Sequence, residues 1–70
     1  MTNRVWIRLP DFSKAAETFL FVLNTHDIFY KNCGGYGGKL CIHIQEDNLA
    51  QVKTLAGLLS YEIDKIEKYS

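Results

Sequence analysis

The 70-residue chain has little of what marks the specialised classes of protein. With two cysteines, one proline and five glycines, it is neither a disulfide-rich scaffold nor a collagen-like or low-complexity polypeptide. Eight basic and eight acidic side chains give a formal net charge of zero, so no bulk positive field marks a nucleic-acid or membrane binder. Since 47% of the residues are hydrophobic, we expect one compact domain over residues 1–70.

Long apolar runs are also lacking. The longest uninterrupted one, residues 19–23, is far too short to span a membrane, and Arg4 and Arg8 interrupt any signal-peptide core near the N-terminus. We therefore expect a cytoplasmic protein that does not bind membranes. In that compartment Cys33 and Cys41 are expected to be free thiols.

The first third of the chain predicts a strand followed by a helix. Residues 4–9 alternate between apolar and polar side chains, which is typical of a half-buried strand, and Pro10 ends it. Asp11 can cap a helix that stops near residues 24–25. The apolar residues of this helix recur at helical spacing and are Phe12, Ala15, Ala16, Phe19, Leu20, Val22 and Leu23.

A β-hairpin is predicted next. Residues 27–33 and 39–45 have the composition of strands, and the glycine-rich segment between them is typical of a turn. A five-residue loop would place Cys33 opposite Lys39, Lys31 opposite Cys41 and Phe29 opposite His43. In that register the apolar residues of both strands share one face, and they are Ile28, Tyr30, Leu40, Ile42 and Ile44.

A second helix begins near Asp47 or Asn48, and its end is open to two interpretations. Its buried stripe consists of Leu49, Val52, Leu55, Ala56 and Leu59. The helix either continues unbroken to about Lys68 or ends at Ser60, leaving residues 61–68 as a fourth strand. The acidic residues Glu46, Asp47, Glu62, Asp64 and Glu67 are interpreted as a solvated helix surface and a cap.

Either ending gives an α+β domain with two helices packed on one face of an antiparallel sheet. An internal repeat of about 35 residues, in which residues 5–9 match residues 40–44 and Asp11 matches Asp47, favours the fourth strand. The element order β-α-β-β-α-β then resembles the ferredoxin-like fold, whose two halves are related by a pseudo-repeat. The resemblance concerns the fold over the whole chain and implies no activity.

The sequence contains no strong motif for catalysis or for a cofactor. Residues 34–39 look superficially like a phosphate-binding loop, but neither Ser nor Thr nor a helix follows them. Cys33, Cys41 and His43 share one sheet face in the predicted register, yet they are only three candidate zinc ligands without the paired spacing of structural zinc sites. We expect no metal, no cofactor and no enzymatic activity.

The most informative feature is the sheet face opposite the helices. The predicted alternation gives it aromatic and basic side chains and no acidic residue, with a further exposed aromatic at the tip of the glycine loop. The candidate partner-binding residues are Arg4, Trp6, Arg8, Phe29, Lys31, Tyr36, Lys39 and His43. Residues 1–43 carry five basic and three acidic groups, and residues 44–70 carry three and five, so we expect an electrically polarised fold.

Two functional classes fit such a face. Trp and Arg are favoured at protein interfaces, so we expect a small non-catalytic protein-binding module, such as a phage- or mobile-element-type inhibitor or regulator that occludes a larger protein. The alternative is a protein that binds single-stranded nucleic acid, with the bases of the nucleic acid stacked on Trp6 and Phe29. Residues 40–44 lack the stacking aromatic of RNA-recognition sheets, which favours the protein partner.

A homodimer is a further expectation. In a three-stranded sheet the backbone of residues 5–7 would form a free edge, and a long second helix would leave Ile63 and Ile66 uncovered. A second copy could bury these features through strand one, through the C-terminal segment, or through both.

Overall fold

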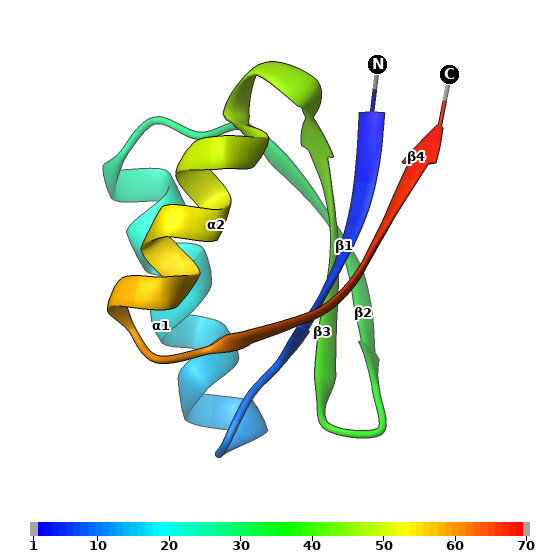
Figure 1. The fold of residues 1–70 in the computed structure, drawn as a ribbon. Coiled ribbons are helices and arrows are strands. Elements are labelled where there is room, and N and C mark those ends of the chain that lie inside the picture. The colour runs from blue at the N-terminus through cyan, green and yellow to red at the C-terminus, as the bar shows by residue number, and fades with distance from the viewer. Residues whose placement is uncertain (1, 70) are drawn as a thin grey trace.

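The computed structural model describes residues 2–69, apart from the side chains of Phe12, Tyr36 and Tyr69. Two helices lie against one face of a four-stranded antiparallel sheet (Figure 1). The elements are β1 (Thr2–Arg8), α1 (Phe12–Thr25), β2 (Tyr30–Tyr36), β3 (Lys39–Gln45), the short 3-10 turn η1 (Glu46–Asn48), α2 (Leu49–Leu58) and β4 (Glu62–Tyr69). The strand order β2-β3-β1-β4 is that of a ferredoxin-like sheet, and the predicted α+β class with a fourth strand is confirmed.

β4 lies beside β1, so that the two ends of the described chain are neighbours (Figure 1). β1 pairs with β3 along one edge and with β4 along the other. The unbroken second helix to Lys68 is therefore wrong, and β1 is a central strand without a free edge. This removes the edge-based reason for a homodimer through strand one, while a dimer through the C-terminal segment stays a prediction.

The turn after α2 has a clear local cause. Ser60 adopts a positive φ of 62°, a left-handed conformation that a continuing helix does not contain. The backbone N–H groups of Ser60 and Tyr61 donate to the carbonyls of Gly57 and Ala56 at 3.0 and 2.8 Å. These hydrogen bonds satisfy backbone carbonyls at the end of α2. The helix therefore stops there, and the chain turns toward the sheet.

The β2–β3 hairpin has a tighter turn than the sequence predicts. Tyr36 pairs with Lys39, so only Gly37 and Gly38 form the loop, with positive φ values of 59° and 78°. Two residues in this conformation match the right-handed twist of the strands, and glycine adopts it without steric cost. The predicted five-residue loop with Cys33 opposite Lys39 is therefore wrong.

Despite this error in register, the side chains of the hairpin are assigned to the correct faces of the sheet. Lys31 lies opposite His43, two residues along β3 from the predicted partner Cys41. Because side chains alternate with a period of two, a shift of two residues leaves each one on its original face. Ile28 and Tyr30 accordingly pack with the core, as expected.

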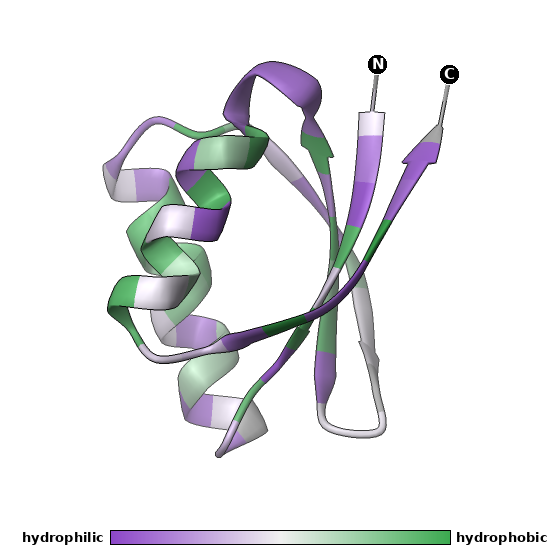
Figure 2. Cartoon of the chain, in the orientation of Figure 1, coloured by the Kyte–Doolittle hydropathy of each residue, from purple (hydrophilic) through white to green (hydrophobic). Residues whose placement is uncertain are grey.

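The core lies between the helices and the sheet. Its fully buried side chains include Val5, Ile7, Phe19, Leu23, Leu40, Ile42, Ile44 and Val52. Along both helices hydrophobic residues alternate with hydrophilic ones, whereas the η1 turn is hydrophilic (Figure 2). Phe19 also packs edge-on against Tyr61, with ring centroids 6.0 Å apart, which ties α1 to the segment that enters β4.

The predicted helix caps are only partly realised. Asp11 and Asn48 occupy the N-cap positions of α1 and α2, but neither side chain forms a capping hydrogen bond. At Asn48 the reason is the preceding η1 turn, which holds the backbone near helical angles instead of the extended ones of an N-cap.

Candidate interaction face of the sheet

The sheet face away from the helices, called the open face below, consists of rows of side chains that cross the strands. One row contains Lys31, His43, Arg4 and Glu67. The next row contains Cys41, Trp6 and Lys65, and a third contains Lys39, Arg8 and Glu62. Asp64 lies at the point where the β1–β4 register shifts, and its carboxylate contacts residues of this third row.

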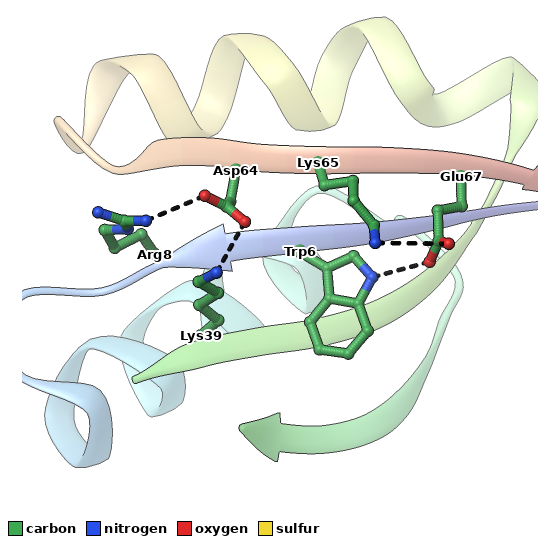
Figure 3. Close-up of polar contacts among 6 residues, drawn as sticks. All are labelled: Trp6, Arg8, Lys39, Asp64, Lys65 and Glu67. Carbon is green, nitrogen blue, oxygen red and sulfur yellow. Dashed lines mark hydrogen bonds and ion pairs between the residues drawn. The ribbon is translucent and has the colours of Figure 1, made fainter. Parts of the chain in front are cut away.

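β4 changes the charge of the open face. The carboxylate of Asp64 lies 2.9 Å from Nζ of Lys39 and 3.1 Å from Nη2 of Arg8, so one acidic group pairs with two of the predicted binding cations (Figure 3). The expectation that this face carries no acidic residue is therefore wrong. That expectation included only the strands before residue 46, whereas the carboxylates of the open face belong to β4.

Glu67 contacts three side chains at the centre of the open face. The indole Nε1 of Trp6 donates a hydrogen bond of 3.0 Å to Oε1 of Glu67, and Nζ of Lys65 lies 3.6 Å from the other carboxylate oxygen (Figure 3). On the other side, Nη1 of Arg4 lies 3.8 Å from Glu67, and Nε of Arg4 donates to Nε2 of His43 at 3.3 Å. The half-buried indole is thus held by its polar edge.

These contacts keep both carboxylates ionised. The hydrogen bond from Lys39, together with the positive charges of Lys39 and Arg8, lowers the pKa of Asp64 below its ordinary value. The hydrogen bond from Trp6, together with the charges of Lys65 and Arg4, lowers the pKa of Glu67. At neutral pH the open face therefore carries fixed charges of both signs.

The open face is only slightly hollowed. A depression of about 200 Å³ is lined by Trp6, Lys39, Asp64 and Lys65. Pockets for small molecules usually have about 300–1,000 Å³ and enclose most of their ligand. This shallow depression suits the insertion of a side chain from a larger partner better than the enclosure of a substrate.

Two of the predicted aromatic binding residues are not seen on the open face: one lies in another part of the molecule, and the side chain of the other is outside the described part of the chain. Phe29 precedes β2, so the predicted pairing with His43 is wrong; it is 79% exposed and lines a different hollow with Asn24 and Asp27. The structure does not bring Phe29 and Trp6 together around one ligand. Tyr36 ends β2 opposite Lys39, and its side chain lies outside the described residues.

The two cysteines lie in β2 and β3 as free thiols. Cys41 is buried, and burial together with the neighbouring Cys33 raises the pKa of its thiol. Within the described residues, no group of three or more His, Cys, Asp or Glu side chains is placed to hold a metal ion. The three residues weighed as zinc ligands share the sheet face without forming such a group.

Sequence reasoning missed the residues Asp64, Lys65 and Glu67 as members of this face. It assigned the acidic ones to a helix surface, although the internal repeat had favoured a strand over the same segment. The alternation Ile63, Asp64, Lys65, Ile66 is irregular because of the register shift, which weakens the period-two signal of a strand.

Comparison with protein-family models, curated proteins and solved structures found no match to this chain. Among the described helices, none combines the length and hydrophobicity needed to cross a membrane.

Proposed function

We propose that this chain is a small, non-catalytic protein-binding module that docks on its partner through the open face. The observation that carries the proposal is the position of Trp6, half-buried and hydrogen-bonded to Glu67 within a face of mixed charges. Trp and Arg dominate the binding energy of many protein interfaces. An indole that is already held in one orientation loses less conformational freedom when a partner covers it.

The pattern of charge favours a protein over a nucleic acid. Three cations of the open face, Arg4, Arg8 and Lys39, lie beside carboxylates of β4, as in the contacts of Asp64 with Lys39 and Arg8. A phosphate approaching these cations would also meet the negative charge of Asp64 and Glu67. A protein surface with its own acidic and basic groups could exchange partners with these ion pairs, and single-stranded nucleic-acid binding remains the alternative.

Occlusion is the mode of action that best fits this geometry. The docking residues lie on an open sheet with a depression of only about 200 Å³, so contact is made by covering a surface. In this proposal the chain inhibits or regulates a larger protein in the cytoplasm, as phage- or mobile-element-type inhibitors do. The binding residues are Arg4, Trp6, Arg8, Lys31, Lys39 and His43, with Phe29 and Tyr36 at the margin.

The test uses Trp6, the single tryptophan of the chain, and it follows binding by isothermal titration calorimetry because Trp6→Ala has no tryptophan fluorescence. A partner is captured from the native host and purified, and its Kd is measured for the wild type and for Trp6→Ala. We expect Trp6→Ala to unfold cooperatively and to bind more weakly by roughly 2 kcal/mol, which is about thirtyfold in Kd.

The matched control is Phe21→Ala, because Phe21 is 70% exposed on α1, away from the open face. This variant should bind as the wild type does. Equal affinity of Trp6→Ala and wild type would reject the open face as the docking site. Loss of cooperative unfolding in Trp6→Ala would instead show that Trp6 belongs to the core.

Salt separates the two functional classes. Affinity that arises from phosphate contacts falls steeply as the ionic strength rises, whereas a hot-spot interface is far less sensitive. We expect the wild type to bind its protein partner with little salt dependence and to show no binding to oligothymidylate at physiological salt. Tight, salt-sensitive binding of the oligonucleotide would favour the alternative.

A further inference from the structure

The β2–β3 ladder contains a bulge at the two cysteines. Regular pairing stops at Asn32 and resumes at Gly35, and between them Cys33 and Gly34 together oppose the single residue Cys41. Adjacent strands lie about 4.7–4.9 Å apart, so a bulge that sets Cys33 across from Cys41 brings their Cα atoms near the span of about 4.4–6.8 Å that a disulfide bridges. Cys33 is also close enough to Cys41 to raise the pKa of its thiol.

The two thiols differ in their access to solvent. Cys33 is half-buried near the hairpin turn, with its Sγ 3.6 Å from the backbone carbonyl of Lys31. Cys41 is only 2% exposed and lies in β3 directly opposite Trp6 of β1. A reagent from solution therefore reaches Cys33 first, whereas Cys41 is accessible mainly to its neighbour across the ladder.

We propose that Cys33 and Cys41 form a dithiol modification site that acquires an intramolecular disulfide by exchange with a small disulfide such as oxidised glutathione. The thiolate of Cys33 attacks one sulfur of the oxidant, forms a mixed disulfide and releases one thiolate. The thiolate of Cys41 then attacks Sγ of Cys33 and releases the second. The two protons of the cysteines pass to the two released thiolates, so the oxidant is reduced to two thiols as the protein dithiol is oxidised.

The bond would lie within the open face. It would close the hairpin between β2 and β3, in the row of side chains that also contains Trp6 and Lys65. The inference does not depend on the proposed function, since it concerns two residues of this chain and a small reagent. If the open face also binds a partner, the modification would alter the same surface.

The experiment exposes the reduced, folded protein to oxidised glutathione and follows it by mass spectrometry and thiol titration. The wild type is expected to lose two thiols and two hydrogen atoms of mass without retaining glutathione. Cys41→Ser is expected to stop at a stable mixed disulfide on Cys33. Cys33→Ser should react at least about tenfold more slowly than Cys41→Ser, because its remaining thiol is buried.

Denaturant provides the control for accessibility. In denaturant Cys33→Ser and Cys41→Ser should react at similar rates, which would show that the difference in the folded state comes from the fold. Peptide mapping of wild-type protein quenched early with acid should locate the transient mixed disulfide at Cys33, and this readout does not require any variant to fold.

Three results would overturn the inference. The wild type could retain glutathione as a stable adduct, which would show that Cys41 does not reach Cys33. It could form disulfide-linked pairs of chains, which would show that the thiols react between molecules. It could stay reduced under conditions that modify Cys41→Ser, which would contradict attack through Cys33.

Discussion

The two faces of the sheet are stabilised in different ways. The covered face buries an apolar set that β1 and β3 supply by simple alternation, such as Val5 and Ile7 from β1. The open face depends on contacts between strands far apart in the sequence, such as Trp6 with Glu67. Burial of apolar area supplies most of the folding energy, whereas exposed ion pairs add little. We infer that the covered face sets stability and that the open face sets what the protein can recognise.

The largest expected effect is on the covered face. Phe19 is fully buried in the core, and Phe19→Ala should lower the free energy of unfolding by about 3–5 kcal/mol through lost burial and the cavity left behind. Urea denaturation followed by circular dichroism measures this change. A domain of this size has little stability in reserve, so the variant should be largely unfolded at 37 °C.

Phe21→Ala is the matched control for this comparison. It makes the same chemical change in the same helix, but Phe21 is 70% exposed, so the free energy of unfolding should change by less than about 0.5 kcal/mol. Similar losses in both variants would contradict the assignment of the helix faces.

The covered face also contains a buried polar side chain, that of Asn3. Asn3 is fully buried; its Nδ2 donates to the carboxylate of Glu46, whereas Oδ1 has no hydrogen-bond partner in the described part of the chain. A buried, unsatisfied carbonyl costs about 1–3 kcal/mol. Asn3→Val should therefore raise the free energy of unfolding by about 1 kcal/mol, because it removes that group and suits a strand.

The same variant has a second readout. The hydrogen bond from Asn3 is the main cause of the lowered pKa of Glu46, so this pKa should rise toward its ordinary value in Asn3→Val, as measured by NMR titration. A rise in the pKa of Glu46 together with a marked loss of stability would show that Oδ1 of Asn3 contributes a bond to water or another group.

The covered face was also the part that sequence patterns could predict. Alternation in residues 4–9 and the helical spacing of Phe19 and Leu23 depend on local periodicity, and the face assignment even survived a hairpin register that was wrong by two residues. The charge of the open face could not be predicted in the same way. It depends on whether residues 61–68 form a helix or a strand, and thus on which distant residues Asp64 and Glu67 meet.

Acid should weaken the open face before it affects the covered one. The pKa values of Asp64 and Glu67 are lowered in the folded state, so their contribution to stability is fully present above the unfolded values near pH 4 and is lost as the pH falls through the folded values. Urea denaturation between pH 7 and pH 2 should show this decline below about pH 4. Asp64→Asn/Glu67→Gln should flatten it, leaving the part due to Glu46.

If the stability of the double variant falls in acid as much as that of the wild type, the acid sensitivity arises from other residues. Its stability at neutral pH is a further check, because exposed ion pairs contribute little there. A large loss at pH 7 would contradict the inference that the open face adds little to stability.

The last expected effect concerns recognition and is seen only at low salt. In Asp64→Asn/Glu67→Gln the open face loses its two central carboxylates, and the net charge of the chain rises from zero to +2. Lys39, Arg8 and Arg4 are then released from their acidic partners, so single-stranded oligothymidylate should bind measurably at low salt, with a gain of up to about tenfold that disappears near physiological salt. Fluorescence of Trp6 follows the titration.

Asp11→Asn/Glu17→Gln is the control, since it gives the same net charge through two exposed residues near the start of α1 and within it. If both double variants gain affinity equally, net charge alone attracts the oligonucleotide, and the carboxylates of β4 do not set selectivity. A gain confined to the open-face variant would show that β4 masks a basic, aromatic surface. The fourth strand would then be the element that directs an otherwise phosphate-compatible sheet toward protein partners.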